Sequence, residues 1–154
     1  MTELTTKIDF LAKAFEIEAT MLEHGALAGT QSEATCPVKH SFGKGCYIRE
    51  WNSPAEMLVV SKVHKVEHPY FVLKGKISVM TDTGIEVIEA PHYGITPAGT
   101  KRVLYTHSET QWITVHVTDE RDIDKIEKAI IADDPVNQLD LGEAYLAVNS
   151  ETPK

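Results

Sequence analysis

The feature that most constrains the fold is a regular succession of short strand-like runs between about Cys46 and Val117. Runs rich in Val, Ile, Tyr and Thr recur every eight to twelve residues, separated by turn-forming segments such as NSPAE, DTG, APH and SET. The eight runs are CYIREW, MLVVSKVH, PYFVLKG, KISVMT, EVIEA, YGITPAG, KRVLYT and WITVHV. Because no helical pattern interrupts them, the sequence predicts a closed or nearly closed antiparallel β sandwich or barrel.

Helical patterns flank this β region on both sides. Residues 3–24 carry apolar side chains at spacings of three, four and seven, which predicts an amphipathic helix that packs on the domain or on a second copy. After TDERD, the run IDKIEKAII returns to helical periodicity. The predicted organisation is an N-terminal helix and linker (1–30), a β barrel (36–118) and a C-terminal helix and tail (119–154). Within the tail, the patch AYLAV is compatible with a docked strand or with a disordered end.

Composition excludes several classes of function. A chain of 154 residues with 42% hydrophobic and 25% charged residues has the profile of one ordinary globular domain. Its formal net charge of −8 argues against a general nucleic-acid binder, which needs a basic face. No apolar run reaches the roughly 18 residues of a membrane span, and the first ten residues lack a signal-peptide pattern. We therefore expect a cytoplasmic protein with two free thiols, Cys36 and Cys46, and read the segment CPVKH around the first as a loop.

Two stretches carry a resemblance to the cupin family. The first family motif reads His-x-His, three or four residues, Glu, six residues and Gly. When HKVEHPYFVLKGKISV is aligned on Gly75, His68 takes the Glu position, His64 the second His position and Lys62 the first. The second family motif, Pro-x-Gly-x-x-His, resembles PAGTKR, where Arg102 takes the His position.

The resemblance covers about residues 40–128 and implies an all-β fold of the cupin, jelly-roll type (a double-stranded β-helix barrel) with an added helix at each end. The region through WITVHVTDERD looks like small cupin-like proteins of phage and prophage genomes, whose activity is generally unassigned. That similarity implies phage components as partners and a host cytoplasm as location. Since cupins commonly pair through strands, it also implies a dimer or a higher homo-oligomer.

The residues in the family's ligand positions argue against its standard four-ligand metal site. Lys62 and Arg102 are cations and not metal ligands, and a divalent ion beside them would be repelled. A three-histidine site is the alternative. His64 and His68 are four residues apart and share a face if they lie on one strand, and His116 could join them from the last strand. Three imidazoles suit a divalent transition metal such as Fe, Zn, Ni or Mn. We expect either such a metal or no cofactor.

The same residues also fit a metal-free pocket. Lys62 and Arg102 would bind a small anion, such as a carboxylate or a phosphate-bearing metabolite. His64 or His68 would act as a general base, with Tyr70 or Tyr105 as the acid. Metal-free cupin isomerases and epimerases of sugar nucleotides resemble this arrangement in outline.

A third interpretation is not enzymatic. An exposed sheet edge and the apolar face of the first helix would build a structural or assembly module, with further copies of the chain or phage components as partners. No partner of the nucleic-acid or membrane class is expected.

Overall fold

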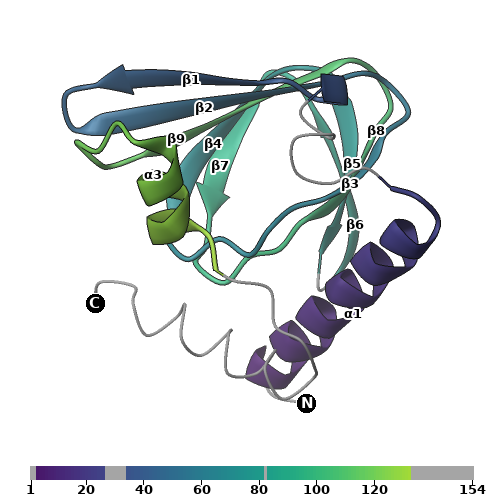
Figure 1. Ribbon diagram of the computed structural model, residues 1–154. Helices are drawn as coiled ribbons and strands as arrows, with labels where there is room; N and C mark the ends of the chain where they lie inside the picture. The colour runs from purple at the N-terminus through teal and green to yellow at the C-terminus, as the bar shows by residue number, and fades with distance from the viewer. Residues whose placement is uncertain (1–2, 27–33, 82, 133–154) are drawn as a thin grey trace.

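The computed structural model describes residues 3–26, 34–81 and 83–132 (Figure 1). In that part of the chain, nine strands lie between two helices. The elements are α1 (Glu3–Glu23), β1 (Val38–Gly43), β2 (Cys46–Ser53), β3 (Leu58–Val60), β4 (His68–Lys74), β5 (Lys76–Thr81), β6 (Gly84–Glu89), β7 (His92–Thr96), β8 (Val103–Thr106), β9 (Thr110–His116) and α3 (Ile123–Ile130). The tail patch AYLAV lies outside the described residues. No helix among them is long and apolar enough to cross a membrane.

The two antiparallel sheets have the strand order of a jelly roll. One sheet runs β1-β2-β9-β4-β7 and the other runs β3-β8-β5-β6. Apart from the added β1, each sheet takes four strands, and the strands that adjoin in a sheet are mostly distant in sequence, as in a jelly roll. The predicted all-β architecture with a helix at each end is confirmed.

The structure adds one strand that the sequence patterns did not reveal. β1 pairs with β2 from Val38↔Trp51 to Gly43↔Cys46, through a tight turn that contains Gly45 with φ +76°. Reading the CPVKH segment as a loop was therefore wrong from Val38 onward. The error has a physical reason, since VKHSFG has three polar residues in a row between Val38 and Phe42 and no apolar alternation, so only its pairing with β2 identifies it as a strand.

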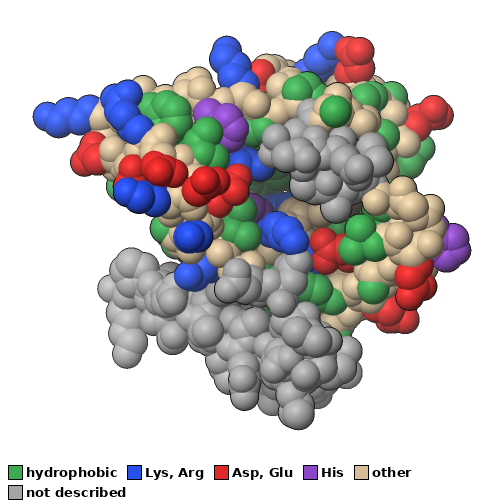
Figure 2. Space-filling model, in the orientation of Figure 1, with side chains coloured by type: hydrophobic (Ala, Val, Ile, Leu, Met, Phe, Trp, Pro, Cys, Tyr) green, Lys and Arg blue, Asp and Glu red, His purple; other side chains and the backbone are tan. Residues whose placement is uncertain are grey.

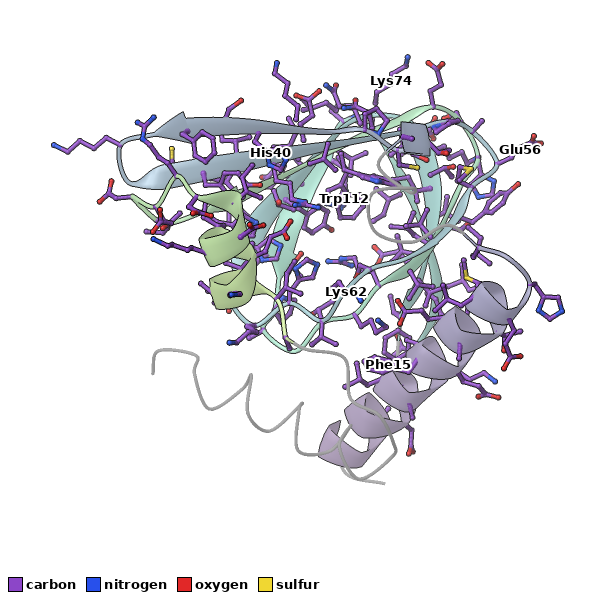
Figure 3. All side chains as sticks on the ribbon, viewed as in Figure 1. Phe15, His40, Glu56, Lys62, Lys74 and Trp112 are labelled. Atoms are coloured by element: carbon purple, nitrogen blue, oxygen red, sulfur yellow. The ribbon has the colours of Figure 1, made fainter. Side chains whose placement is uncertain are left out.

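The side chains between the sheets divide into two halves. An apolar half contains Val72, Ile77, Val79, Ile88 and Leu104, all less than a tenth exposed. A polar half contains His64, His68, Thr96, Arg102 and His116. Tyr70 and Trp112 lie between the halves with their rings stacked at 4.6 Å and 12°, and Figure 3 shows Trp112 between the two sheets.

Both helices pack beside the polar half. α1 places Leu11 against Val63, on the segment that joins β3 to β4. α3 begins after Asp122, whose side chain accepts hydrogen bonds from the backbone N–H groups of Asp124 and Lys125. Its two buried side chains, Ile126 and Ile130, form an apolar cluster with Tyr47 of β2, and Phe42 of β1 and Ile131 pack against this cluster. Val63 precedes His64, and Tyr47 stacks on His116, so both helices lie close to residues of the polar half. Figure 1 shows α1 and α3 on the same side of the two sheets.

Candidate functional site

Three histidines that are far apart in the chain meet in the polar half. The ring centroids of His64 and His68 are 4.9 Å apart, and those of His68 and His116 are 4.5 Å apart. His68 and His116 are 3% and 4% exposed, and His64 is half-buried. We call these three residues the histidine cluster. Figure 2 shows that the molecule is hollowed on the face toward the viewer, with Lys or Arg (blue) and His (purple) side chains in the hollow.

The elements that position the three rings differ from the expectation. His68 begins β4 and His116 ends β9. Both side chains are buried and lie on the inward face of their strand. His64 is not on β4 but on the preceding segment, where isolated bridges connect it to Thr100 and to Ile131. The spacing of four therefore does not bring His64 to His68 through one shared strand face. Backbone hydrogen bonds from His64 N to Thr100 O (2.9 Å) and from Gly99 N to His64 O (2.7 Å) hold it instead.

Each ring of the cluster has one buried nitrogen without a hydrogen-bond partner. These atoms are His64 Nδ1, His68 Nε2 and His116 Nδ1. His68 Nδ1–H donates to the Val66 carbonyl over 2.9 Å, and because a carbonyl only accepts, a neutral His68 keeps its lone pair on Nε2. His116 Nε2 lies 3.0 Å from the Thr114 hydroxyl, to which it can donate, leaving a lone pair on Nδ1. A buried polar atom without a partner is costly, so three of them on neighbouring rings mark this cluster as the candidate ligand-binding site.

Burial keeps the cluster neutral. It lowers the pKa of His64 to about 3, with His68 and then Arg102 adding repulsion. It likewise lowers the pKa of His116 to about 3, helped by His68 and Arg49. The pKa of His68 is also lowered, mainly by burial, although its hydrogen bond to Val66 opposes the change. Neutral imidazoles are the form that binds metals.

The three imidazoles are suitable metal ligands, and the measured distances between their ring centroids agree with a shared metal. The present arrangement of the rings does not form a metal site. Two imidazoles on one metal, with metal–nitrogen bonds of about 2.1 Å, have centroids roughly 5 Å apart, close to the separations seen here. Even so, among the described residues no three His, Cys, Asp or Glu side chains are arranged to hold a metal ion. Metal binding would therefore require the rings to turn about their side-chain torsions until the three free nitrogens converge.

Arg102 is the cation of the polar half. Its guanidinium lies over the rings of Tyr70 (5.0 Å) and Trp112 (5.4 Å) and donates from Nη2 to Thr96 Oγ1 over 3.0 Å. Burial lowers its pKa, while Tyr70 and Glu86 oppose that change. The structure thus brings Arg102 to the same space as the histidine cluster, as the alignment to the second family motif predicts.

Tyr70 has a partner that the sequence did not reveal. Its hydroxyl lies 3.1 Å from His92 Nε2, and His92 is half-buried on β7, although its turn-like sequence context indicates a surface residue. Burial raises the pKa of the Tyr70 hydroxyl. Tyr105, the other candidate acid, is exposed and packs against His107, away from the cluster.

The lysine that the structure buries is not the one that the sequence analysis proposed as a pocket cation. Lys62 is exposed on the segment between β3 and β4 (Figure 3), whereas the buried cation is Lys101, which is 1% exposed. Lys101 Nζ forms an ion pair of 2.9 Å with Glu18 of α1, donates to the Ser61 carbonyl over 2.8 Å, and lies 4.2 Å from the centre of the Phe15 ring. Burial therefore gives no support to Lys62 as a ligand-binding residue, and that role stays a prediction.

Two side chains of β2 close the space beside His116. Arg49 forms an ion pair of 3.1 Å with Glu127 of α3. The Tyr47 ring stacks on the His116 ring at 5.8 Å, and its hydroxyl lies 2.6 Å from His40 Nδ1. Sequence reasoning missed this layer because its members lie on β1, β2 and α3 and meet only in the folded chain.

A separate surface hollow of about 500 Å³ lies at the other end of the barrel. It is open to solvent and lined in part by Ser53, Thr110 and the ion-paired Lys74 and Glu109. Thr110 and His116 are the two ends of β9, which places this hollow about 20 Å from the cluster. The hollow lacks the buried, unpartnered polar atoms of the cluster, so we place the candidate site at the histidines.

Comparisons with known proteins do not assign a reaction. No protein-family model matches the chain, and no curated protein matches its sequence.

Solved cupin structures are similar to part of the chain. A cupin domain from Bordetella pertussis is 12% identical, with a TM-score of 0.43 over 54% of this chain and 93% of that one. A cupin-2 domain containing protein from Shewanella frigidimarina is 10% identical, with a TM-score of 0.44 over 53% and 79%. A cupin superfamily protein from Desulfitobacterium hafniense is 10% identical, with a TM-score of 0.46 over 55% and 78%. None of the three descriptions mentions a phage, so the phage origin stays a prediction. The structural neighbours are cupin-domain proteins at low identity, and the chain itself folds as a small, mostly β protein of two antiparallel sheets and two helices.

Proposed function

We propose that this protein binds a divalent transition metal through His64, His68 and His116 and receives a small anionic ligand at Arg102 beside it. The observation that carries the proposal is the set of three buried imidazole nitrogens without partners, one on each ring. Lone pairs from three histidines suit Fe, Zn, Ni or Mn and leave coordination positions open. Such a metal would supply Lewis acidity when bound.

The chain's own residues would prepare the site. The Val66 carbonyl fixes the His68 tautomer, and the Thr114 hydroxyl does the same for His116 when it accepts from Nε2. The Tyr47 ring, together with the Arg49–Glu127 ion pair, limits the access of water on the α3 side. Arg102 would hold the anionic end of a ligand next to the open positions.

The metal-free alternative is weaker on chemical grounds. A general base works best with a pKa near the working pH, whereas the pKa of His64 lies near 3. The pKa of His68 is lowered too. These rings are neutral at pH 7 but accept a proton poorly, and this favours their role as metal ligands over their role as bases.

Metal content by elemental mass spectrometry tests the proposal. Untagged wild-type protein is expected to hold about one metal per chain after incubation with Fe, Zn, Ni or Mn salts. The double variant His64→Ala/His68→Ala should hold none, while His107→Ala, an exposed histidine outside the cluster, should keep it. Addition of Co(II) should give visible absorption bands of imidazole coordination in the wild type and in His107→Ala, but not in the double variant. A wild type that takes up no metal under any of these conditions would refute the metal site.

A second candidate role, self-assembly, is favoured by one observation. Four apolar side chains on the outer faces of β4 and β7 are exposed, namely Phe71, Leu73, Tyr93 and Ile95. We call these residues the outer apolar patch. Among the described strands, β7 is also the last of its sheet, so its outer edge can pair with the same edge of a second copy around a two-fold axis. An uncharged patch suits this partner, because two copies of a chain with net charge −8 repel each other elsewhere.

A further inference from the structure

The guanidinium of Arg102 is a largely buried charge without a counter-ion. Its side chain donates to the Thr96 hydroxyl and lies on two aromatic rings, and among the described residues no acidic side chain forms an ion pair with it. Taking a charge out of water costs several kcal/mol unless an opposite charge accompanies it. An anion bound there would supply the negative charge that the described residues do not place beside Arg102.

The charges around Arg102 set the charge of that anion. Arg49 is already neutralised by Glu127, and Lys101 by Glu18. Glu86 of β6 acts on Arg102 only through space and forms no ion pair with it. Among the described residues of the polar half, Arg102 is therefore the cation that no carboxylate balances, which matches a monoanion better than a phosphate dianion.

The geometry around Arg102 favours a planar anion. The guanidinium lies over the faces of two rings that are stacked within 12° of each other, and the Thr96 hydroxyl accepts from one of its nitrogens. The two rings and the Thr96 hydroxyl hold the guanidinium in place, and further N–H groups are left for a ligand. A fixed guanidinium fork matches the two oxygens of a carboxylate, and lysine cannot reproduce this contact.

We infer that the ligand of this site is a small monocarboxylate, whose two oxygens accept a pair of hydrogen bonds from Arg102. The inference builds on the proposed function, because the carboxylate would lie in the space that the histidine cluster faces. It does not require the metal for its main contact, so the two can be tested separately.

Calorimetric titration of metal-stripped protein tests the inference directly. The probes are acetate, propionate, pyruvate and benzoate, each compared with its amide, together with inorganic phosphate and sulfate. We expect at least one carboxylate to bind at least tenfold more tightly than its amide and than phosphate. Arg102→Gln should abolish this binding, Arg102→Lys should weaken it at least tenfold, and Lys76→Gln, at an exposed lysine of β5, should leave it unchanged.

A second variant, which leaves the Arg102 side chain in place, distinguishes a loss of binding from a loss of folding. Thr96→Val removes the hydroxyl that orients Arg102 while keeping the size of the side chain, and it should weaken carboxylate binding severalfold in a protein with unchanged circular dichroism. Equal or tighter binding of phosphate would overturn the inference, as would undiminished carboxylate binding by a folded Arg102→Gln. So would the absence of any binding at millimolar concentration.

Metal-loaded protein separates this inference from the metal proposal. Carboxylate binding that needs Arg102 but survives His64→Ala/His68→Ala supports the inference even if no metal is ever bound. Binding that appears only with metal and ignores Arg102→Gln would mean that the metal holds the carboxylate, and the inference would be wrong while the metal site stood.

Discussion

Lys101 and Glu18 form a buried ion pair of 2.9 Å between the barrel and α1, and the lysine side chain is fully buried while the glutamate is 20% exposed. The lysine also donates to the Ser61 carbonyl and contacts the ring of Phe15, the latter on α1. One cation therefore connects the N-terminal helix, the segment after β3 and the segment before β8.

The unequal exposure of this pair predicts unequal effects of removing each partner. Glu18→Gln removes a carboxylate that neutralises a fully buried ammonium group and should lower the free energy of unfolding by about 3 kcal/mol. Lys101→Met leaves a glutamate that can reach water and should cost less than about 1 kcal/mol. Urea unfolding measures both. If Lys101→Met proved the more damaging change, the ion pair would not be the main attachment of α1.

Acid should destabilise the metal-free protein through the histidine cluster. The pKa values of His64 and His116 fall from 6.5 to about 3 on folding, so the unfolded chain takes up protons below about pH 6.5 that the native chain refuses. The free energy of unfolding should therefore decrease from about pH 6.5 to pH 3, by at most about 1.4 kcal/mol per pH unit for each histidine. The double variant His64→Asn/His116→Asn should show a flatter profile in urea unfolding at pH 7, 6, 5 and 4. Parallel profiles for the two proteins would contradict a neutral, buried cluster.

Gly94→Ala should disturb the Tyr70–Trp112 stack. A Cβ at residue 94 would lie 2.9 Å from both Cε1 and Oη of Tyr70, which forces the ring to move. We expect a loss of about 1–3 kcal/mol of stability and a changed near-ultraviolet circular dichroism spectrum. In a Tyr70→Leu background the same substitution should cost less, because the contacting ring atoms are gone. An equal cost in both backgrounds would place the strain elsewhere.

Self-association should depend on the outer apolar patch. Tyr93, 76% exposed on β7, stacks with Phe71 at 6.2 Å and leaves most of its ring to solvent. Tyr93→Lys should shift a dimer toward monomer in sedimentation velocity, since like charges would meet across a two-fold interface. Val117→Lys, at an even more exposed apolar residue outside the patch, is the control. A wild type that is monomeric at all concentrations would remove this role.

The sequence predicted the fold better than the site. The eight strand-like runs between Cys46 and Val117 correspond to β2–β9, because alternation and turn residues are local signals. Gly75, on which the alignment to the first family motif rests, lies at a position that requires glycine. Its φ is +108°, and a Cβ there would lie 2.6 Å from the Glu109 carbonyl oxygen.

The site depends on contacts between distant segments, and there sequence reasoning was uneven. It named the three histidines that meet, although His64 reaches His68 through bridges to Thr100 and Ile131 and not along a strand. It proposed Lys62 as a pocket cation, whereas the buried lysine is Lys101, whose partner Glu18 lies on the first helix. Neither the Lys101–Glu18 pair nor the Tyr70–His92 contact has a short-range pattern that could have revealed it.

The Tyr70–Trp112 stack has a consequence for how this barrel can change. The largest apolar cluster of the described residues lies on one side of the stack, and its burial favours folding. The histidines and Arg102, on the other side, contribute donors and charge at some cost to stability. Substitutions among the polar residues could therefore change which ligand is bound. The Tyr70–Trp112 pair separates these residues from the apolar cluster, so such substitutions should leave that cluster intact.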